Sequence, residues 1–87
     1  MSKYTVVLSK KAQKTLNGLS DSIVEPIHNA IAALGENPRP IGCIKLTNRE
    51  AYRIRTGNYR IIYEIIDNKL FVYIVDVGHR KDVYRKQ

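Results

Sequence analysis

Hydrophobic residues recur at two different spacings along this chain. Between about residues 10 and 35 they follow the three- and four-residue spacing of amphipathic helices. This spacing predicts a first helix over Lys10–Asn17, with Ser9 as its N-cap. It predicts a second helix that starts between Ser20 and Pro26 and ends near residue 35. The inward positions are Ala12, Leu16 and Leu19 in the first helix, and Ile23, Ile27, Ala30, Ile31 and Leu34 in the second.

The other hydrophobic segments are typical of β-strands. They are Tyr4–Leu8 before the helices, and Ile44–Leu46, Ala51–Thr56, Tyr59–Ile66 and Leu70–Val77 after them. Gly57-Asn58 and Asp67-Asn68 are interpreted as two-residue turns between consecutive strands. The order β-α-α-β-β-β-β predicts one α+β domain over residues 1–87. We expect a twisted, mostly antiparallel sheet with the two N-terminal helices packed on one face.

The turn at Gly57-Asn58 fixes which side chains share a face of that sheet. A two-residue loop pairs Arg55 with Arg60, and strand alternation then places Arg53 on the same face. Tyr52, Ile54, Ile61, Tyr63 and Ile65 are expected to point toward the helices. Like charges directly opposite each other destabilise a sheet by about 0.2–1 kcal/mol, so this arginine cluster requires an explanation.

Two explanations are compatible with the pattern. In the first, the arginines are a solvated surface, which is the usual state of charged side chains on a sheet. In the second, the three guanidinium groups form a fork for a phosphate group. Phe71 and Tyr73 are expected on the same face, where aromatic rings suit unpaired bases. The alternative for these two rings is partial burial, or cover by the tail or a partner.

Charge favours a nucleic acid, an anionic surface or an acidic protein as the partner. The 87 residues include 15 Lys and Arg against 8 Asp and Glu, a net charge of +7. The single cysteine, Cys43, excludes an internal disulfide, and clustered metal ligands are not visible. We therefore expect no metal or cofactor. No apolar run approaches the roughly 20 residues of a membrane span, so we expect a cytoplasmic protein without membrane contact.

The C-terminal segment contains further candidates for phosphate and proton chemistry. It runs His79-Arg80-Lys81-Asp82-Val83-Tyr84 and directly follows the last predicted strand. Arg80 and Lys81 are candidates for phosphate contacts. Tyr84 is a candidate proton-transfer residue if nearby cations favour its phenolate. His79 is a second candidate because imidazole titrates near neutral pH. The alternative is that His79 is a surface or capping residue, as single histidines usually are.

Two segments together resemble the RelE/ParE toxin superfamily. The first is Tyr52-Arg53-Ile54-Arg55-Thr56-Gly57-Asn58-Tyr59-Arg60-Ile61-Ile62-Tyr63, which is similar to the family's central strand pair. The second is Gly78-His79-Arg80 followed by Val83-Tyr84, an ending that many RelE-like members share. The element order agrees as well, so the resemblance extends over nearly the whole chain.

This resemblance implies the toxin of a toxin–antitoxin pair. RelE-like members are ribosome-dependent endoribonucleases that cut mRNA in the ribosomal A site, and they need no metal. ParE-like members share the fold, act on DNA gyrase and generally lack the full set of basic residues and tyrosine. The implied partners are a cognate acidic antitoxin, forming a toxin–antitoxin hetero-oligomer, and the ribosome with its mRNA.

The resemblance also implies roles for individual residues. Arg60 and Arg80 would bind the scissile phosphate, with Arg53 and Arg55 on flanking phosphate. Some family nucleases have lysine where this chain has Arg53 and Arg55, and arginine is a poor proton acceptor because it stays charged. Proton transfer then falls to Tyr84, with His79 as the alternative. Three other interpretations remain open: a gyrase-directed toxin, a basic binding module without chemistry, and an inactive toxin retained as a repressor component.

Overall fold

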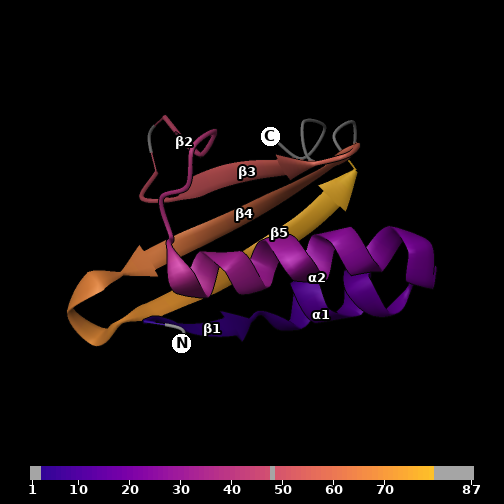
Figure 1. Ribbon diagram of the computed structural model, residues 1–87, viewed down its shortest axis with the longest axis horizontal. Helices are drawn as coiled ribbons and strands as arrows, with labels where there is room; N and C mark the ends of the chain where they lie inside the picture. The colour runs from indigo at the N-terminus through magenta and orange to yellow at the C-terminus, as the bar shows by residue number, and fades with distance from the viewer. Residues whose placement is uncertain (1–2, 48, 80–87) are drawn as a thin grey trace.

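The computed structural model describes residues 3–47 and 49–79 (Figure 1). Along the chain lie β1 (Thr5–Leu8), α1 (Lys10–Asn17), α2 (Asp21–Glu36), β2 (Ile44–Lys45), β3 (Tyr52–Thr56), β4 (Tyr59–Ile66), the 3-10 turn η1 (Asp67–Lys69) and β5 (Phe71–His79). The predicted α+β order is confirmed. The predicted bounds of β4 are the observed ones, and those of the other four strands differ by one or two residues at an end. β5 continues through Gly78, where we expected it to end.

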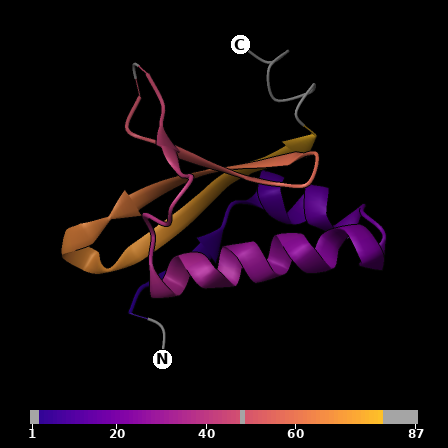
Figure 2. The same cartoon turned by 45° about the horizontal axis from the view of Figure 1, so that its top comes forward.

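All five strands form one sheet in the order β1-β5-β4-β3-β2. β1 runs parallel to β5, whereas β5, β4, β3 and β2 pair antiparallel in turn. Both helices cover the same face of this sheet (Figure 2). The prediction of a mostly antiparallel sheet with two helices on one face is therefore correct. The opposite face is called the open face below, because neither helix covers it.

The core lies between the helices and the centre of the sheet. α1 and α2 contribute Ala12, Leu16, Ile27, Ile31 and Leu34, and the sheet contributes Ile54, Ile61, Tyr63, Val72, Ile74 and Val77. Most of these positions follow from the helical and strand periodicities. Cys43 is partly buried and packs against this cluster.

The second helix differs from the prediction in two respects. It begins at Asp21 and continues through Pro26, because burial of the apolar residues that follow outweighs the local cost of the proline. Ile23, which we expected in the core, is 41% exposed. It lies in the first turn of α2, at the end that extends beyond the sheet (Figure 1). Neither described helix is long and apolar enough to cross a membrane.

The β4–β5 hairpin contains two irregularities that the sequence analysis did not predict. Its turn is η1 followed by Leu70 at φ 56°, in place of a two-residue loop at Asp67-Asn68. The pairing also shifts by one residue, because Ile62 pairs with Asp76 whereas Tyr63 pairs with Ile74. Val75 is therefore the extra residue of a β-bulge.

Ser9 connects this bulge to α1. Its Oγ accepts a hydrogen bond from the N–H of Ala12 at 3.0 Å, as the predicted N-cap does, and donates one to the carbonyl of Val75 at 2.7 Å. The N–H of Ser9 also donates to the carbonyl of Ile74 at 2.9 Å. One serine thus stabilises the start of the helix and the irregular point of the neighbouring strand.

Candidate nucleic-acid interface

The β3–β4 hairpin places three arginines on the open face. Arg55 pairs directly with Arg60, and Arg53 lies two residues earlier in β3. Gly57 has φ 60° and is the one turn residue with positive φ, as in a type II′ turn, which suits the twist of the strands. The predicted register of this hairpin is confirmed at the four pairs from Arg53 to Thr56, and Tyr52 pairs with Tyr63 in the same register.

The three arginines differ sharply in exposure. Arg55 is exposed, Arg53 is half-buried, and Arg60 is only 1% exposed. The partner of Arg60 in β5 is Gly78, which has no side chain to occupy the space above the strand. The expected open fork of three guanidinium groups is therefore only partly present: two are accessible in this conformation and the third is a buried positive charge.

Arg53 presents a donor that the described residues do not use. Its Nε is buried and makes no hydrogen bond within residues 3–47 and 49–79. A buried polar atom without a hydrogen bond costs about 1–3 kcal/mol, and phosphate oxygens are natural acceptors for a guanidinium. Arg53 and Arg55 thus form an accessible cationic pair on β3.

Tyr73 and Phe71 share the open face with the arginines but lie at its other end. Tyr73 pairs with Glu64 and Phe71 with Ile66, so about 13 Å of strand separates Tyr73 from Arg60. Tyr73 is 36% exposed and Phe71 40%, next to the similarly exposed Val7 of β1. The face assignment is correct, but these rings form an apolar surface separate from the arginines.

His79 lies on the opposite side of the sheet from the arginines. The bulge at Val75 reverses the alternation in β5, so His79 pairs with Tyr59 and shares its face. The two rings meet edge to face, with centroids 5.5 Å apart. The sequence analysis gave His79 as an alternative proton-transfer residue beside the phosphate-binding arginines, and the structure places it on the other face of the sheet from Arg53, Arg55 and Arg60. Arg80, Lys81 and Tyr84 lie outside the described residues.

A polar cluster that the sequence analysis missed fixes the loop before β2. Asp67 accepts hydrogen bonds from Arg39 at 2.9 Å and 3.3 Å and from the hydroxyl of Tyr4 at 2.7 Å. The Arg39 guanidinium, followed by the Tyr4 hydroxyl, holds the pKa of Asp67 below its usual value. In turn, the hydrogen bond to Asp67 raises the pKa of Tyr4. Arg39 and Tyr4 lie 28 and 63 positions from Asp67 in the sequence, so no local sequence pattern predicts these contacts.

Aromatic contacts continue from this cluster into the core. The guanidinium carbon of Arg39 lies 5.5 Å from the ring centre of Tyr52, and Tyr52 stacks on Tyr63 with centroids 5.9 Å apart. The buried hydroxyl of Tyr63 donates to the carbonyl of Pro38 at 2.8 Å, and burial raises its pKa. These contacts hold the Pro38–Gly42 loop against β3 and β4.

Within the described residues, no group of three or more His, Cys, Asp or Glu side chains has the geometry of a metal site. The accessible guanidinium groups of Arg53 and Arg55 can bind anions such as phosphate. A five-stranded sheet with two helices on one face is the fold that the resemblance to the RelE/ParE superfamily implies.

Comparison with known proteins assigns the family. The model described as "ParE toxin of type II toxin-antitoxin system, parDE" matches residues 6–84, and the chain belongs to this RelE/ParE toxin family. It is 33% identical over 87 residues to toxin RelG of Mycobacterium tuberculosis, covering 95% of this chain and 98% of RelG. It is 30% identical over 81 residues to the mRNA interferase toxin RelE of Escherichia coli, covering 90% and 84%.

Solved structures show the same architecture. The toxin–antitoxin complex RelBE2 of M. tuberculosis contains a chain that matches with a TM-score of 0.79 at 27% identity, covering 90% of this chain and 99% of that one. The archaeal RelE–RelB complex of Pyrococcus horikoshii contains one that matches with a TM-score of 0.80 at 26% identity, covering 90% and 96%. The fold is therefore that of RelE-type toxins.

Proposed function

We propose that this chain is the toxin of a toxin–antitoxin pair and acts as a ribosome-dependent endoribonuclease on mRNA in the A site. The observation that carries the proposal is the accessible pair Arg53 and Arg55 on the open face, in a chain related to an mRNA interferase. Two adjacent guanidinium groups suit the phosphates of a single strand.

The reaction uses a nucleophile that RNA itself supplies. The ribose 2′-oxygen attacks the adjacent phosphorus, a new 2′-O–P bond forms, and the P–O5′ bond breaks. One proton leaves the 2′-hydroxyl and one is delivered to the departing 5′-oxygen. The products are a 2′,3′-cyclic phosphate and a 5′-hydroxyl. DNA lacks the 2′-hydroxyl and is not cut by this route.

The protein's part is to bind the phosphates, stabilise charge and move protons. We assign Arg53 and Arg55 to flanking phosphate and to the transition-state charge. Arg60 and Arg80 are assigned to the scissile phosphate. Arg60 contacts that phosphate only in a conformation that exposes its guanidinium; while buried, it contributes a positive potential beneath the open face.

Tyr84 is our assignment for the general base. The position of the His79 ring, on the far side of the sheet against Tyr59, argues against its alternative role in proton transfer. Lys81 is assigned to outer phosphate contacts. Tyr73 is assigned to stacking on a base at the apolar end of the open face.

The proposed protein partner is an acidic antitoxin that buries apolar surface of this chain. Opposite charge guides association, but apolar burial holds a complex together. The exposed residues Val7, Phe71 and Tyr73 form an apolar surface on the same face as the arginines. Solved relatives include complexes of RelE with RelB.

Primer extension on translated mRNA tests the proposed activity. Arg55→Ala removes an exposed cation from the open face and is expected to reduce cleavage strongly without unfolding the protein. Lys14→Ala, which removes an exposed cation from α1, is the matched control and should cleave normally. Tyr84→Phe should lower the cleavage step by about 10²–10⁴-fold while leaving ribosome binding nearly intact.

The second candidate function is a gyrase-directed toxin, favoured by the ParE description of the family model. It predicts no RNA cleavage with or without ribosomes, together with inhibition of purified gyrase in a supercoiling assay. Cleavage lost in Arg55→Ala but retained in Lys14→Ala supports the nuclease. Inhibition of gyrase that is unaffected by Arg55→Ala would support the gyrase-directed toxin over the nuclease.

A further inference from the structure

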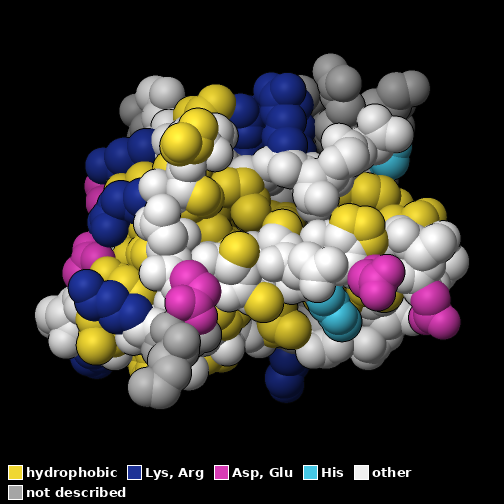
Figure 3. All heavy atoms as spheres, in the orientation of Figure 1, with side chains coloured by type: hydrophobic (Ala, Val, Ile, Leu, Met, Phe, Trp, Pro, Cys, Tyr) yellow, Lys and Arg dark blue, Asp and Glu magenta, His cyan; other side chains and the backbone are white. Residues whose placement is uncertain are grey.

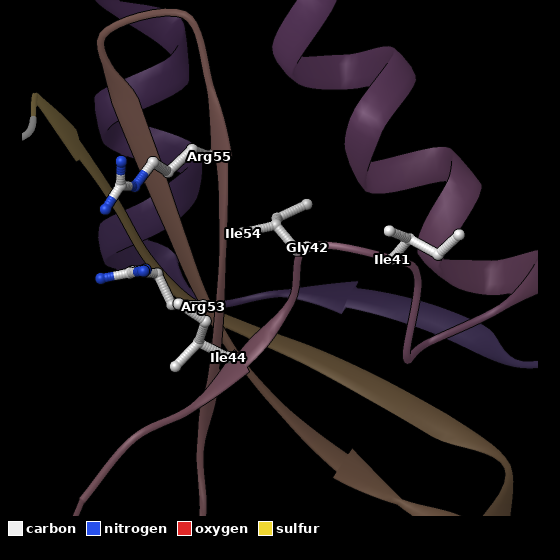
Figure 4. Close-up of a pocket in the computed structure, with 6 residues that line it drawn as sticks. All are labelled: Ile41, Gly42, Ile44, Arg53, Ile54 and Arg55. Atoms are coloured by element: carbon white, nitrogen blue, oxygen red, sulfur yellow. The ribbon is translucent and has the colours of Figure 1, made fainter.

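Glu64 is a carboxylate on the open face that the proposed function does not use. It lies two residues after Ile62, the partner of Arg53 in β3. Strand alternation therefore places it on the side to which Arg53 and Arg55 extend (Figure 4). Its partner in β5 is Tyr73. Glu64 is half-buried and makes no hydrogen bond or ion pair with another residue of 3–47 and 49–79.

The other described carboxylates lie elsewhere or have a cation as partner. Three belong to α2, where Asp and Glu side chains lie on the helix-covered side of the molecule (Figure 3): Asp21, Glu25 and Glu36. Three form ion pairs: Glu50 with Lys45, Asp67 with Arg39, and Asp76 with Lys11. Among the residues that the structure describes, Glu64 is therefore the one carboxylate on the open face without an ion pair.

The neighbours of Glu64 on the sheet are apolar or aromatic. Along β4, the adjacent residues on the same face are Ile62 and Ile66, and Tyr73 pairs with Glu64 across the strands. A cation, Arg53, lies only diagonally across the β3–β4 pair, roughly 7–8 Å away. Placing a carboxylate among apolar side chains without a paired cation lowers stability, so this position requires an explanation.

A carboxylate beside an exposed aromatic ring matches two features of an unpaired guanine base. Tyr73 is 36% exposed and offers its ring for stacking. The two oxygens of a carboxylate accept hydrogen bonds and donate none. Guanine presents two adjacent donors, N1–H and N2–H, on its Watson–Crick edge, whereas each of the other three RNA bases presents a single donor group there. A phosphate or an acidic side chain is repelled by a carboxylate.

We infer that Glu64 and Tyr73 form a site for an unpaired guanine, in which Tyr73 stacks on the base and Glu64 accepts hydrogen bonds from N1–H and N2–H. The inference rests on the proposed function and adds a residue that determines base specificity. Because Arg53 is a diagonal neighbour of Glu64, the base site and the phosphate contacts lie side by side on the open face.

The test measures binding of short single-stranded RNA oligomers that differ only in one central base, by fluorescence anisotropy at low salt. The unaltered chain should favour the guanine oligomer roughly 5- to 150-fold, which is the discrimination of a bidentate contact to a base edge. Glu64→Gln keeps the shape of the side chain but replaces one acceptor oxygen by a donor, so it should remove most of this preference. It should bind the other three oligomers at least as tightly, because a negative charge is lost.

Two further variants complete the test. Glu25→Gln makes the same chemical change at an exposed position of α2, and this matched control should keep the guanine preference. Tyr73→Ala should weaken binding of all four oligomers, because every base has a face that stacks. Glu64→Gln should melt no lower than the unaltered chain, since it removes an unpaired charge, so unfolding would not account for a lost preference.

Two results would overturn the inference and leave the proposed function standing, provided that binding still depends on Arg55. One is equal affinity of the unaltered chain for the four oligomers, and the other is a guanine preference that persists in Glu64→Gln. If Glu64→Gln weakened only the binding of an antitoxin peptide, the group that contacts Glu64 would be a basic side chain of that peptide. Failure of the unaltered chain to bind any of the oligomers would overturn both the inference and the proposed function.

Discussion

Replacing His79 by alanine and by phenylalanine separates a positioning role from a proton-transfer role. The edge-to-face contact with Tyr59, with ring centroids 5.5 Å apart, is of a kind that contributes about 0.5–1.5 kcal/mol to stability. If all of this free energy is expressed in the transition state, losing the contact slows cleavage roughly 2- to 13-fold. A general acid or base contributes about 10²–10⁴-fold. The two ranges do not overlap, so the size of the effect decides between the roles.

The assay is single-turnover cleavage on mRNA-programmed ribosomes at several pH values. We expect His79→Ala to slow cleavage roughly 2- to 13-fold, His79→Phe to restore it, and neither variant to change the shape of the pH profile. Tyr59→Ala should have an effect similar to His79→Ala, and the double variant should be no worse than either. A loss above 100-fold in both His79 variants, with one limb of the pH profile removed, would refute this reasoning.

Three further predictions concern stability. Tyr63→Phe leaves the buried carbonyl of Pro38 unpaired and should lower the free energy of unfolding by about 1–3 kcal/mol. The melting temperature should fall by about 4–8 °C for each kcal/mol lost. The control Tyr73→Phe, which alters an exposed ring, should leave the melting temperature unchanged. Ser9→Ala removes a helix cap and a bond at the bulge, and chemical denaturation should show a loss of about 1–3 kcal/mol. The pKa of Asp67 is lowered in the folded state, so the unfolded chain binds more protons and stability is lost as pH falls below about 4. Asp67→Asn should show a smaller fall in melting temperature between pH 6 and pH 3; an equal fall would contradict the role of this carboxylate.

The part of the site that lies on one hairpin could be predicted because its register depends on local rules. Gly57 and the alternation of the neighbouring residues determine that Arg53, Arg55 and Arg60 share a face, and the structure confirms each pair. The exposure of these arginines could not be predicted in the same way. It depends on what lies across the sheet, such as Gly78 opposite Arg60.

The position of His79 shows a different limit. Strand alternation places a residue only if no extra residue interrupts the strand, and Val75 interrupts β5. Ser9, which lies 66 residues away in sequence, donates a hydrogen bond to the Val75 carbonyl at this bulge. Phe71 and Tyr73 were assigned to the correct face although the predicted turn was wrong. The observed turn has four residues between the paired Ile66 and Phe71, two more than predicted, and a shift by two residues keeps each side chain on its face.

The place of β5 in the sheet has a consequence for how the protein is made. β5 is the last described strand to be synthesised, yet it lies between β1 and β4 and contributes Val72, Ile74 and Val77 to the core. While β5 is still inside the ribosome that synthesises it, β1 has no partner strand and the helices have only part of their sheet. We therefore expect the nascent chain to stay unfolded, and harmless to the ribosome that makes it, until β5 has left that ribosome.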